Sequence, residues 1–185
     1  ETNEVIGNAN TDPVDGSYFV ILPSGKNYGY FIDHPDYFPI SNNIDLRNST
    51  TNQQLIMNIP ITSYDEMIND YEAVPVNNLF FKSGKHQLER GSFNELNRII
   101  DILNRTQFDN LKIQIGGHTD DVGTAKLNEE LSQKRAKAVA EYLISKGISH
   151  DKIEVKGFGF NQPIESNSTE SGRKKNRRVE IKVVG

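Results

Sequence analysis

The residues best suited to chemistry stand close together in the second half of the 185-residue chain. The stretch Gly116-Gly117-His118-Thr119-Asp120-Asp121 follows a strand pattern, and Arg135 lies on the helix pattern that comes next. An aspartate at the end of a strand and a guanidinium one helix further on can together hold a ligand that carries both an ammonium and a carboxylate. The same two residues can instead pair with each other as a structural salt bridge. The spacing alone leaves both interpretations open.

The same stretch allows a metal site, because His118, Asp120 and Asp121 are residue types that commonly bind metal ions. A metal-dependent hydrolase is therefore an alternative hypothesis. A metal site usually recruits three or four protein ligands, and no second histidine stands at a recognisable ligand spacing. The chain has no cysteine and no serine in a G-x-S-x-G motif, which argues against a catalytic nucleophile. We expect no metal, no cofactor and no catalytic residue, with His118 held by local hydrogen bonds at the strand end.

Composition limits the classes of partner. The formal net charge of -4 argues against general binding to nucleic acid or to anionic membranes. The basic run at residues 173–178 has no interleaved aromatic residue for base stacking, so we expect a solvated loop there. No window approaches the roughly 18 to 20 apolar residues that a membrane span needs. Because the chain begins with Glu1 rather than Met, we expect a fragment of a longer protein.

β-strand alternation dominates residues 1–61. Apolar residues alternate with others at 18–22, 28–32 and 55–61, and the turn sequence Pro23-Ser24-Gly25-Lys26 separates the first two runs. These runs predict a small all-β, sandwich-like module of four to six strands. Periodicity is lost over residues 62–75, which are rich in acidic residues and end near a proline. We interpret this segment as a linker that holds at most one helical turn.

Residues 76–185 predict an α+β domain with the order β-α-β-α-β, a long polar loop, and a last β-strand. Strand patterns stand at 78–82, 111–115, 153–155 and 179–183. A capping box, Ser92-Phe93-Asn94-Glu95, predicts the start of one helix over 93–103. A second helix pattern covers residues 127–143, and Gly147 is the expected C-cap. Helices packed over a mixed sheet would bury these apolar faces.

The N-terminal motif resembles a known structural module. The stretch Asp15-Gly16-Ser17-Tyr18, followed by Leu22-Pro23-Ser24-Gly25 and Tyr28, is similar to the core of carboxypeptidase-regulatory-like β-sandwich modules. Such sandwiches usually have about seven strands, so the resemblance implies an abbreviated or truncated spacer without chemistry. The aromatic side chains could instead stack on sugars, which makes a carbohydrate-binding module a further alternative. The aromatic residues concerned are Tyr18, Tyr28, Tyr30, Phe31, Tyr37 and Phe38.

The second half resembles the OmpA C-terminal-like family, which includes peptidoglycan-associated lipoproteins and flagellar stator proteins. Many motif positions stand in the family's order and spacing between residues 76 and 185. The motif residues are Gly117-His118-Thr119-Asp120, Gly123, Asn128, Leu131-Ser132, Arg135-Ala136, Val139, Tyr142-Leu143, Gly147-Ile148 and Asn176-Arg177-Arg178-Val179-Glu180-Ile181. Many family members also carry an acid after the aromatics of the first strand, where this chain has Phe81-Lys82-Ser83. A ligand contact from that strand is therefore not implied.

The resemblance implies non-covalent binding of peptidoglycan, without cleavage, through the diaminopimelate of the stem peptide. Asp120 would accept the ligand's ammonium, Arg135 would bind its carboxylate, and Arg177 would add a further contact. Thr119 and Asn128 fall on positions that line the pocket. The family also implies a periplasmic location associated with the outer membrane, and partners among other envelope proteins of an outer-membrane complex. A sandwich followed by an OmpA-like domain resembles envelope proteins of type IX secretion systems.

Overall fold

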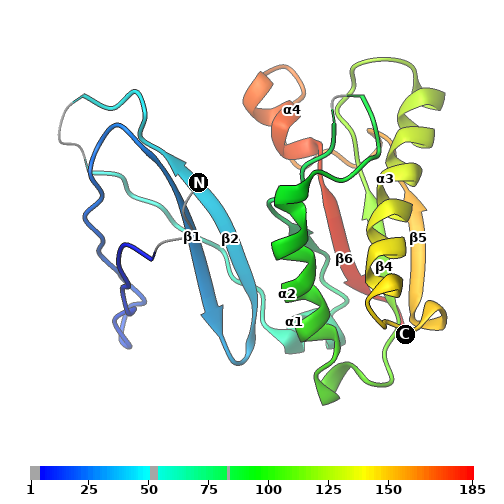
Figure 1. Cartoon of the computed structure of the whole chain (residues 1–185), viewed down its shortest axis with the longest axis horizontal. Helices are drawn as coiled ribbons and strands as arrows, with labels where there is room; N and C mark the ends of the chain where they lie inside the picture. Colours follow the sequence, from blue (N-terminus) through cyan, green and yellow to red (C-terminus); the bar gives the residue numbers. More distant parts are fainter. Residues whose placement is uncertain (1–4, 51–53, 83) are drawn as a thin grey trace. The chain divides into compact units, whose positions relative to one another are not determined.

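The computed structural model describes residues 5–50, 54–82 and 84–185 (Figure 1). The chain forms two compact units. Unit 1 is made by the described residues of 1–30 and 43–58, and unit 2 by residues 31–42 and the described residues of 59–185. Strands β1 (Asn27–His34) and β2 (Tyr37–Asp45) pair in a two-stranded sheet, and each strand contributes residues to both units.

Unit 1 is mostly irregular outside that sheet. Two backbone hydrogen bonds join the residues just before β1 to the residue just after β2. Gly25 N donates to Leu46 O, and Leu46 N donates to Lys26 O, each at 2.8 Å. The predicted run at 28–32 lies in β1, but residues 18–22 and 55–61 are in no strand, so the described part of 1–61 has two strands instead of the four to six predicted. Phe19 and Ile21 remain 77% and 80% exposed. The alternation did not produce strands there, because a two-stranded ribbon offers no second layer to bury their apolar side chains.

Unit 2 has the predicted α+β architecture (Figure 1). Its four-stranded sheet has the order β3-β6-β4-β5, in which β4 and β5 are parallel and β6 is antiparallel to both β3 and β4. The elements are α1 (Tyr64–Asn69), β3 (Val74–Val76), η1 (Arg90–Ser92), α2 (Phe93–Leu103), η2 (Thr106–Phe108), β4 (Ile113–Gly117), α3 (Ala125–Ser145), η3 (His150–Lys152), β5 (Ile153–Gly157), α4 (Glu170–Asn176) and β6 (Val179–Val183).

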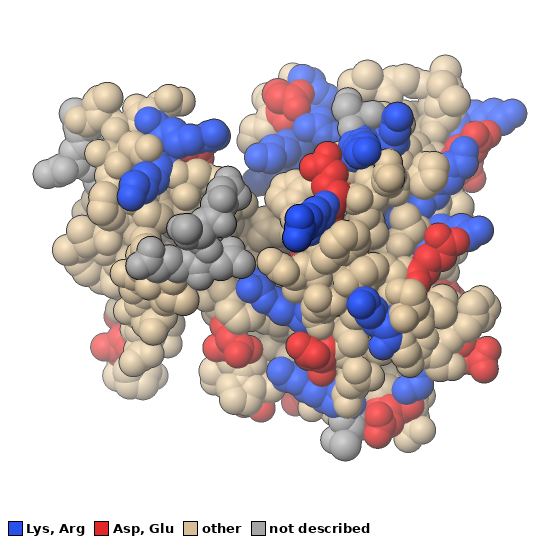
Figure 2. Space-filling view, in the orientation of Figure 1, with Lys and Arg blue, Asp and Glu red and all other residues tan. Residues whose placement is uncertain are grey.

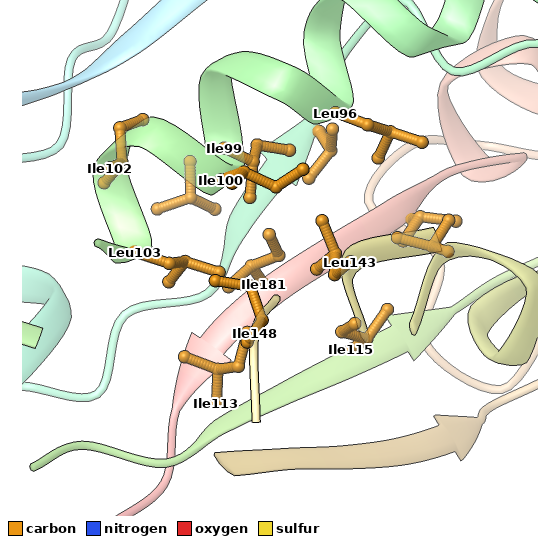
Figure 3. Close-up of a cluster of buried hydrophobic side chains, with 14 of the residues drawn as sticks. Leu96, Ile99, Ile100, Ile102, Leu103, Ile113, Ile115, Leu143, Ile148 and Ile181 are labelled. Atoms are coloured by element: carbon orange, nitrogen blue, oxygen red, sulfur yellow. The ribbon is translucent and has the colours of Figure 1, made fainter. Parts of the chain in front are cut away.

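The core lies between the sheet and helices α2 and α3 (Figure 3). Helix α2 buries Leu96, Ile99 and Leu103 at helical spacing, and β4 supplies Ile113 and Ile115 from alternate positions. This is the pattern that predicted both elements. Over the face formed by α2 and α3, basic and acidic side chains are interspersed (Figure 2). No helix in the described parts of the chain combines the length and apolar character needed to cross a bilayer.

The first strand of the sheet differs from the prediction. It lies at Val74–Val76 rather than at residues 78–82, where Phe81 forms only an isolated bridge with Leu88. Pro75 is tolerated because β3 is an edge strand paired on one side to β6. Asn78, with φ of 56°, turns the chain directly after this strand. This turn separates residues 79–82 from β3, and they are in no strand of the sheet.

The segment predicted to be a linker, residues 62–75, holds α1 and the first two residues of β3. Its Tyr64, Met67 and Val74 side chains are buried in the core of unit 2. Ser63 and Glu66 form a capping box at the start of α1: Ser63 Oγ accepts from Glu66 N, and Ser63 N donates to the Glu66 carboxylate. The segment therefore packs as part of unit 2.

The capping box predicted at Ser92 and Glu95 does not form. Ser92 lies in the turn η1 and has helical backbone angles, so its side chain does not face the first amides of α2. Its hydroxyl instead accepts from Phe80 N and donates to Phe80 O. The Glu95 carboxylate is buried and accepts hydrogen bonds from Ser41 Oγ at 2.6 Å and from Arg98 Nη1 at 3.1 Å. Both side chains therefore form tertiary hydrogen bonds instead of capping the first turn of α2.

Candidate functional site

Two glycines bring helix α3 unusually close to the sheet. Gly117 on β4 and Gly157 on β5 are paired neighbours; Gly117 faces Ser132 and Ala136 of α3, and Gly157 faces Ser132 and Gln133. A Cβ atom at Gly117 would collide with the backbone carbonyl of Ser132, and one at Gly157 with the backbone of Gln133. The helix can approach only because both side chains are absent. This packing brings Arg135, one turn further along α3, towards the end of β4, where Asp120 follows.

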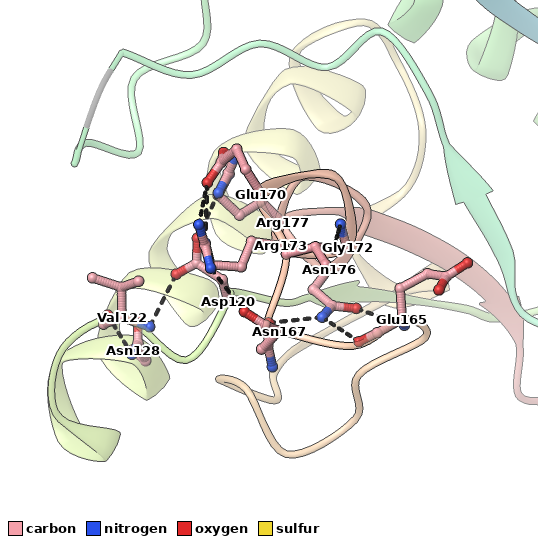
Figure 4. A network of polar contacts seen from close by, with 11 residues as sticks. Asp120, Val122, Asn128, Glu165, Asn167, Glu170, Gly172, Arg173, Asn176 and Arg177 are labelled. Atoms are coloured by element: carbon pink, nitrogen blue, oxygen red, sulfur yellow. Dashed lines mark hydrogen bonds and ion pairs between the residues drawn. The ribbon is translucent and has the colours of Figure 1, made fainter.

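Asp120 and Arg177 form the centre of the candidate site (Figure 4). Arg177 Nη1 donates to Asp120 Oδ2 at 2.6 Å, although the two residues are 57 positions apart. The Asp120 side chain is 13% exposed, and its Oδ1 also accepts from Val122 N at 3.2 Å. Arg177 Nη2 donates to Glu170 Oε1 at 2.8 Å. The hydrogen bond to Asp120, followed by the one to Glu170, raises the pKa of Arg177 above its ordinary value.

Arg135 lies close to this pair but is held differently. Its Nε donates to Lys85 O at 3.1 Å, and its guanidinium lies over the Phe81 ring at 5.1 Å. Within the described residues, Arg135 forms no ion pair with a carboxylate. Burial lowers the pKa of Arg135, the nearby positive charge of Arg177 lowers it further, and Asp120 partly opposes both effects. The structure therefore pairs Asp120 with Arg177, and leaves Arg135 desolvated and repelled by a second guanidinium.

Thr119, next to Asp120 in the chain, and Asn128 are both buried. Thr119 N donates to Gly159 O at 2.9 Å, and its Oγ1 has no hydrogen-bond partner among the described residues. Asn128, on α3, donates from Nδ2 to Val122 O at 3.0 Å. This bond ties the turn after Asp120 to the helix. Asn128 therefore supports the loop that carries Asp120.

His118 belongs to a separate cluster on the other face of the sheet. Its ring is 1% exposed, stacks on Phe158 at 4.9 Å, and places Nε2 3.1 Å from Glu180 Oε1. Burial raises the pKa of the Glu180 carboxyl, but His118 and Arg178 outweigh burial and hold this pKa below its ordinary value. Asp121 is exposed. In the parts of the chain that the structure describes, no three His, Asp or Glu side chains are arranged to hold a metal ion.

A buried asparagine, Asn176, organises the segment that carries Arg177; it belongs to the family motif, but the sequence did not indicate this structural role. Asn176 is fully buried; its Oδ1 accepts from Ile164 N and Glu165 N, and its Nδ2 donates to Glu165 O and Asn167 Oδ1 (Figure 4). Residues 170–176 form helix α4 where we expected a loop. The available signal was Thr169, whose Oγ1 caps the helix by accepting from Gly172 N at 3.0 Å.

Comparison with solved structures defines the class of fold. The periplasmic domain of Helicobacter pylori MotB is 28% identical to this chain, with a TM-score of 0.52 over 60% of this chain and 73% of that one. Comparison of sequences adds the peptidoglycan-associated lipoprotein of Buchnera aphidicola, which is 33% identical over 144 residues, or 76% of this chain and 81% of that protein.

A sequence model of the OmpA family matches residues 80–177. The chain belongs to the OmpA family, as the motifs predicted. The peptidoglycan-binding protein ArfA of Mycobacterium tuberculosis is 46% identical over 88 residues, 48% of this chain. The chain spans only 26% of the length of ArfA.

Proposed function

We propose that this chain binds peptidoglycan without cleaving it, through the free end of diaminopimelate in the stem peptide. Two relatives are named for this polymer, the peptidoglycan-binding protein ArfA and the peptidoglycan-associated lipoprotein. One structural observation carries the proposal. Arg135 is a partly desolvated guanidinium with no carboxylate of its own among the described residues, and it lies beside an aspartate that a ligand can share.

The uncrosslinked, unamidated end of diaminopimelate carries an ammonium and a carboxylate on one carbon. The ammonium would bind the Asp120 carboxylate in place of Arg177, which donates to Asp120 Oδ2 at 2.6 Å in the absence of ligand. The carboxylate would bind the two Nη groups of Arg135, because Nε is already committed to Lys85 O. Arg177 would approach the same carboxylate. A negative charge placed there relieves the repulsion between the two arginines, which lowers the pKa of Arg135 in addition to burial.

The expected affinity is modest. Hydrogen bonds to charged groups contribute roughly 1.5 to 3 kcal/mol each. Three or four such bonds, less the cost of ordering the ligand, correspond to an affinity on the order of micromolar. Repeated stem peptides along the polymer compensate, because neighbouring sites raise the effective concentration. A lysine-type stem peptide has the amine but lacks the second carboxylate, so Arg135 would lose its partner.

Co-sedimentation with purified sacculi tests this proposal. Asp120→Asn and Arg135→Met remove one charge each while keeping similar volume, and each should weaken retention by about 10- to 100-fold, the equivalent of one charge-assisted bond. Lys134→Met is the matched control, because Lys134 is a neighbouring α3 cation whose side chain is 57% exposed. Retention of both site variants at wild-type levels, with the fold intact by circular dichroism, would contradict the proposal.

Two further comparisons separate the alternatives. Diaminopimelate-type sacculi should retain the protein better than lysine-type sacculi. The supernatant should contain no new muropeptides, with or without added divalent metal, whereas a hydrolase would release them. We further propose that this binding tethers an outer-membrane or secretion-associated assembly, such as a type IX secretion system, to the cell wall from the periplasm. Other envelope proteins of that assembly would be the partners.

A further inference from the structure

Arg177 lies between two carboxylates that differ in their role. Asp120 is largely buried, with 13% of its side chain exposed, whereas the Glu170 side chain is 68% exposed. In the proposed function, the ligand's ammonium takes over Asp120. Arg177 then loses its shortest contact, the 2.6 Å bond to Asp120 Oδ2, at the moment when its charge is needed by the ligand's carboxylate. The 2.8 Å bond to Glu170 Oε1 is the contact that remains.

Glu170 is fixed independently of Arg177. Its other oxygen, Oε2, accepts from Arg173 Nε at 3.0 Å and lies 2.9 Å from Arg173 Nη2. Arg173 is itself fixed, because its Nη1 donates to Asn167 O at 2.9 Å. The hydrogen bond from Arg177, followed by the one from Arg173, holds the pKa of Glu170 below its ordinary value, so the carboxylate stays ionised. The position of the Glu170 carboxylate therefore does not depend on Arg177 alone.

The segment around Glu170 is also rigid. Thr169 caps α4, and buried Asn176 closes its far end against residues 164–167. A side chain at Gly172 would collide with the backbone carbonyl of Ser166, so the helix sits tightly on the preceding loop. The backbone that carries Glu170 is therefore held in place. A residue can position a neighbouring side chain only if its own backbone is fixed in this way.

We propose that Glu170 is a positioning and specificity-determining residue of the peptidoglycan site. It holds the Arg177 guanidinium in place while Asp120 exchanges Arg177 for the ligand's ammonium. This inference rests on the proposed function. Glu170 also limits the positive charge of the site: Arg135, Arg173 and Arg177 together with Asp120 and Glu170 sum to +1, and loss of the Glu170 charge would raise the sum to +2. A lower positive charge favours a zwitterionic ligand end over a purely anionic one.

The test uses three substitutions in the whole chain. Glu170→Gln removes the charge, and Glu170→Asp keeps the charge but shortens the side chain that bridges Arg173 and Arg177. Glu165→Gln is the matched control, because Glu165 lies in the loop before α4 and pairs with Lys175 at 2.9 Å rather than with Arg177. The probes are sacculi, free meso-diaminopimelate, and pimelate, which has the same carbon chain and carboxylates but no amine.

Glu170→Gln should reduce retention on sacculi by about three- to fivefold, as expected for a solvent-screened ion pair. It should reduce the preference for meso-diaminopimelate over pimelate, because the site then carries excess positive charge. Glu170→Asp should weaken retention similarly but keep more of that preference. Glu165→Gln should match the wild type in both measurements.

The outcomes separate this inference from the function on which it rests. If wild-type protein does not bind sacculi, the proposed function is wrong and this inference with it. If the wild type binds and Arg135→Met does not, while Glu170→Gln keeps both wild-type retention and the wild-type preference, only the role of Glu170 is refuted. A loss of retention without any change in preference would refute the specificity role and leave the positioning role.

Discussion

The substitution Gly117→Ala tests whether the close approach of α3 to β4 sets the geometry of the site. A Cβ atom added at Gly117 would lie 2.9 Å from the carbonyl carbon of Ser132, about half an ångström inside the ordinary contact limit of 3.4 Å, and closer still to its oxygen. The obstacle is helix backbone, so no change of side-chain rotamer can relieve it. Strand and helix must separate.

Overpacking a core costs roughly 1 to 3 kcal/mol, and the rigid obstacle places Gly117→Ala near the upper end, about 3 kcal/mol. That is a large share of a typical total stability of about 5 to 15 kcal/mol. The matched control is Gly116→Ala on the same strand. Its Cβ would face the opposite side of the sheet, 3.0 Å from Phe158 Cε2 and 3.1 Å from Glu180 Cγ. Both obstacles are side chains that can move, so we expect about 1 kcal/mol.

Urea unfolding followed by circular dichroism measures the loss of stability, and sacculus co-sedimentation measures the effect on peptidoglycan binding. Gly117→Ala should also weaken retention by about tenfold, because a shift of α3 moves Arg135 relative to Asp120, and binding depends on holding both groups at fixed separation. Gly116→Ala should retain binding. If the two variants lose equal stability and bind equally, the glycine contact does not determine the site geometry.

Two further predictions concern buried polar groups. Ser41→Ala removes the hydroxyl that donates to buried Glu95 at 2.6 Å, so unfolding free energy should fall by about 1 to 2 kcal/mol in urea titrations, with exposed Ser171→Ala unchanged. Glu180 should make stability depend on pH. Burial raises its pKa, but His118 and Arg178 together outweigh burial, and the folded pKa is depressed below its ordinary value. Its contribution is therefore present above the unfolded pKa and lost as pH falls through the folded pKa. The stability advantage of wild type over Glu180→Gln should shrink as pH falls below the ordinary pKa of a glutamate, about 4.3, and through the lower folded pKa; a constant advantage would count against this account.

The sequence predicted the parts of unit 2 whose apolar spacing is strictly local. Helix α2 and strands β4 and β6 follow the periodicity of their own residues, because each buries one face against the same core. Local spacing also identified Asp120 and Arg135 as neighbours on consecutive elements. It did not indicate the partner of Asp120, because the contact with Arg177 joins residues 57 positions apart and depends on how β6 returns beside β4.

The missed features depend on tertiary context. Alternation at residues 18–22 records apolar spacing but not whether a second layer exists to cover it. Helix α4 has only seven residues and little apolar character, so its stability rests on Asn176 and its bonds to residues 164–167 rather than on helical propensity. Nothing in the sequence distinguished Glu170 from other glutamates in polar segments. Its contacts with Arg173 and Arg177 are visible only in the structure.

The extent of the binding domain follows from the same contacts. Unit 2 contains residues 31–42, and Arg98 lies over the Phe31 ring at 4.2 Å while Ser41 binds Glu95. Val74 pairs with Ile181 of β6, and Met67 is buried in the core. We therefore propose that the binding domain extends beyond the predicted boundary at residue 76. A deletion of residues 1–75 would remove an edge strand and part of the core, so a loss of binding after it would not implicate the N-terminal aromatic residues in sugar stacking. Single substitutions of exposed aromatics in unit 1 isolate that question, because they leave the buried contacts of unit 2 unchanged.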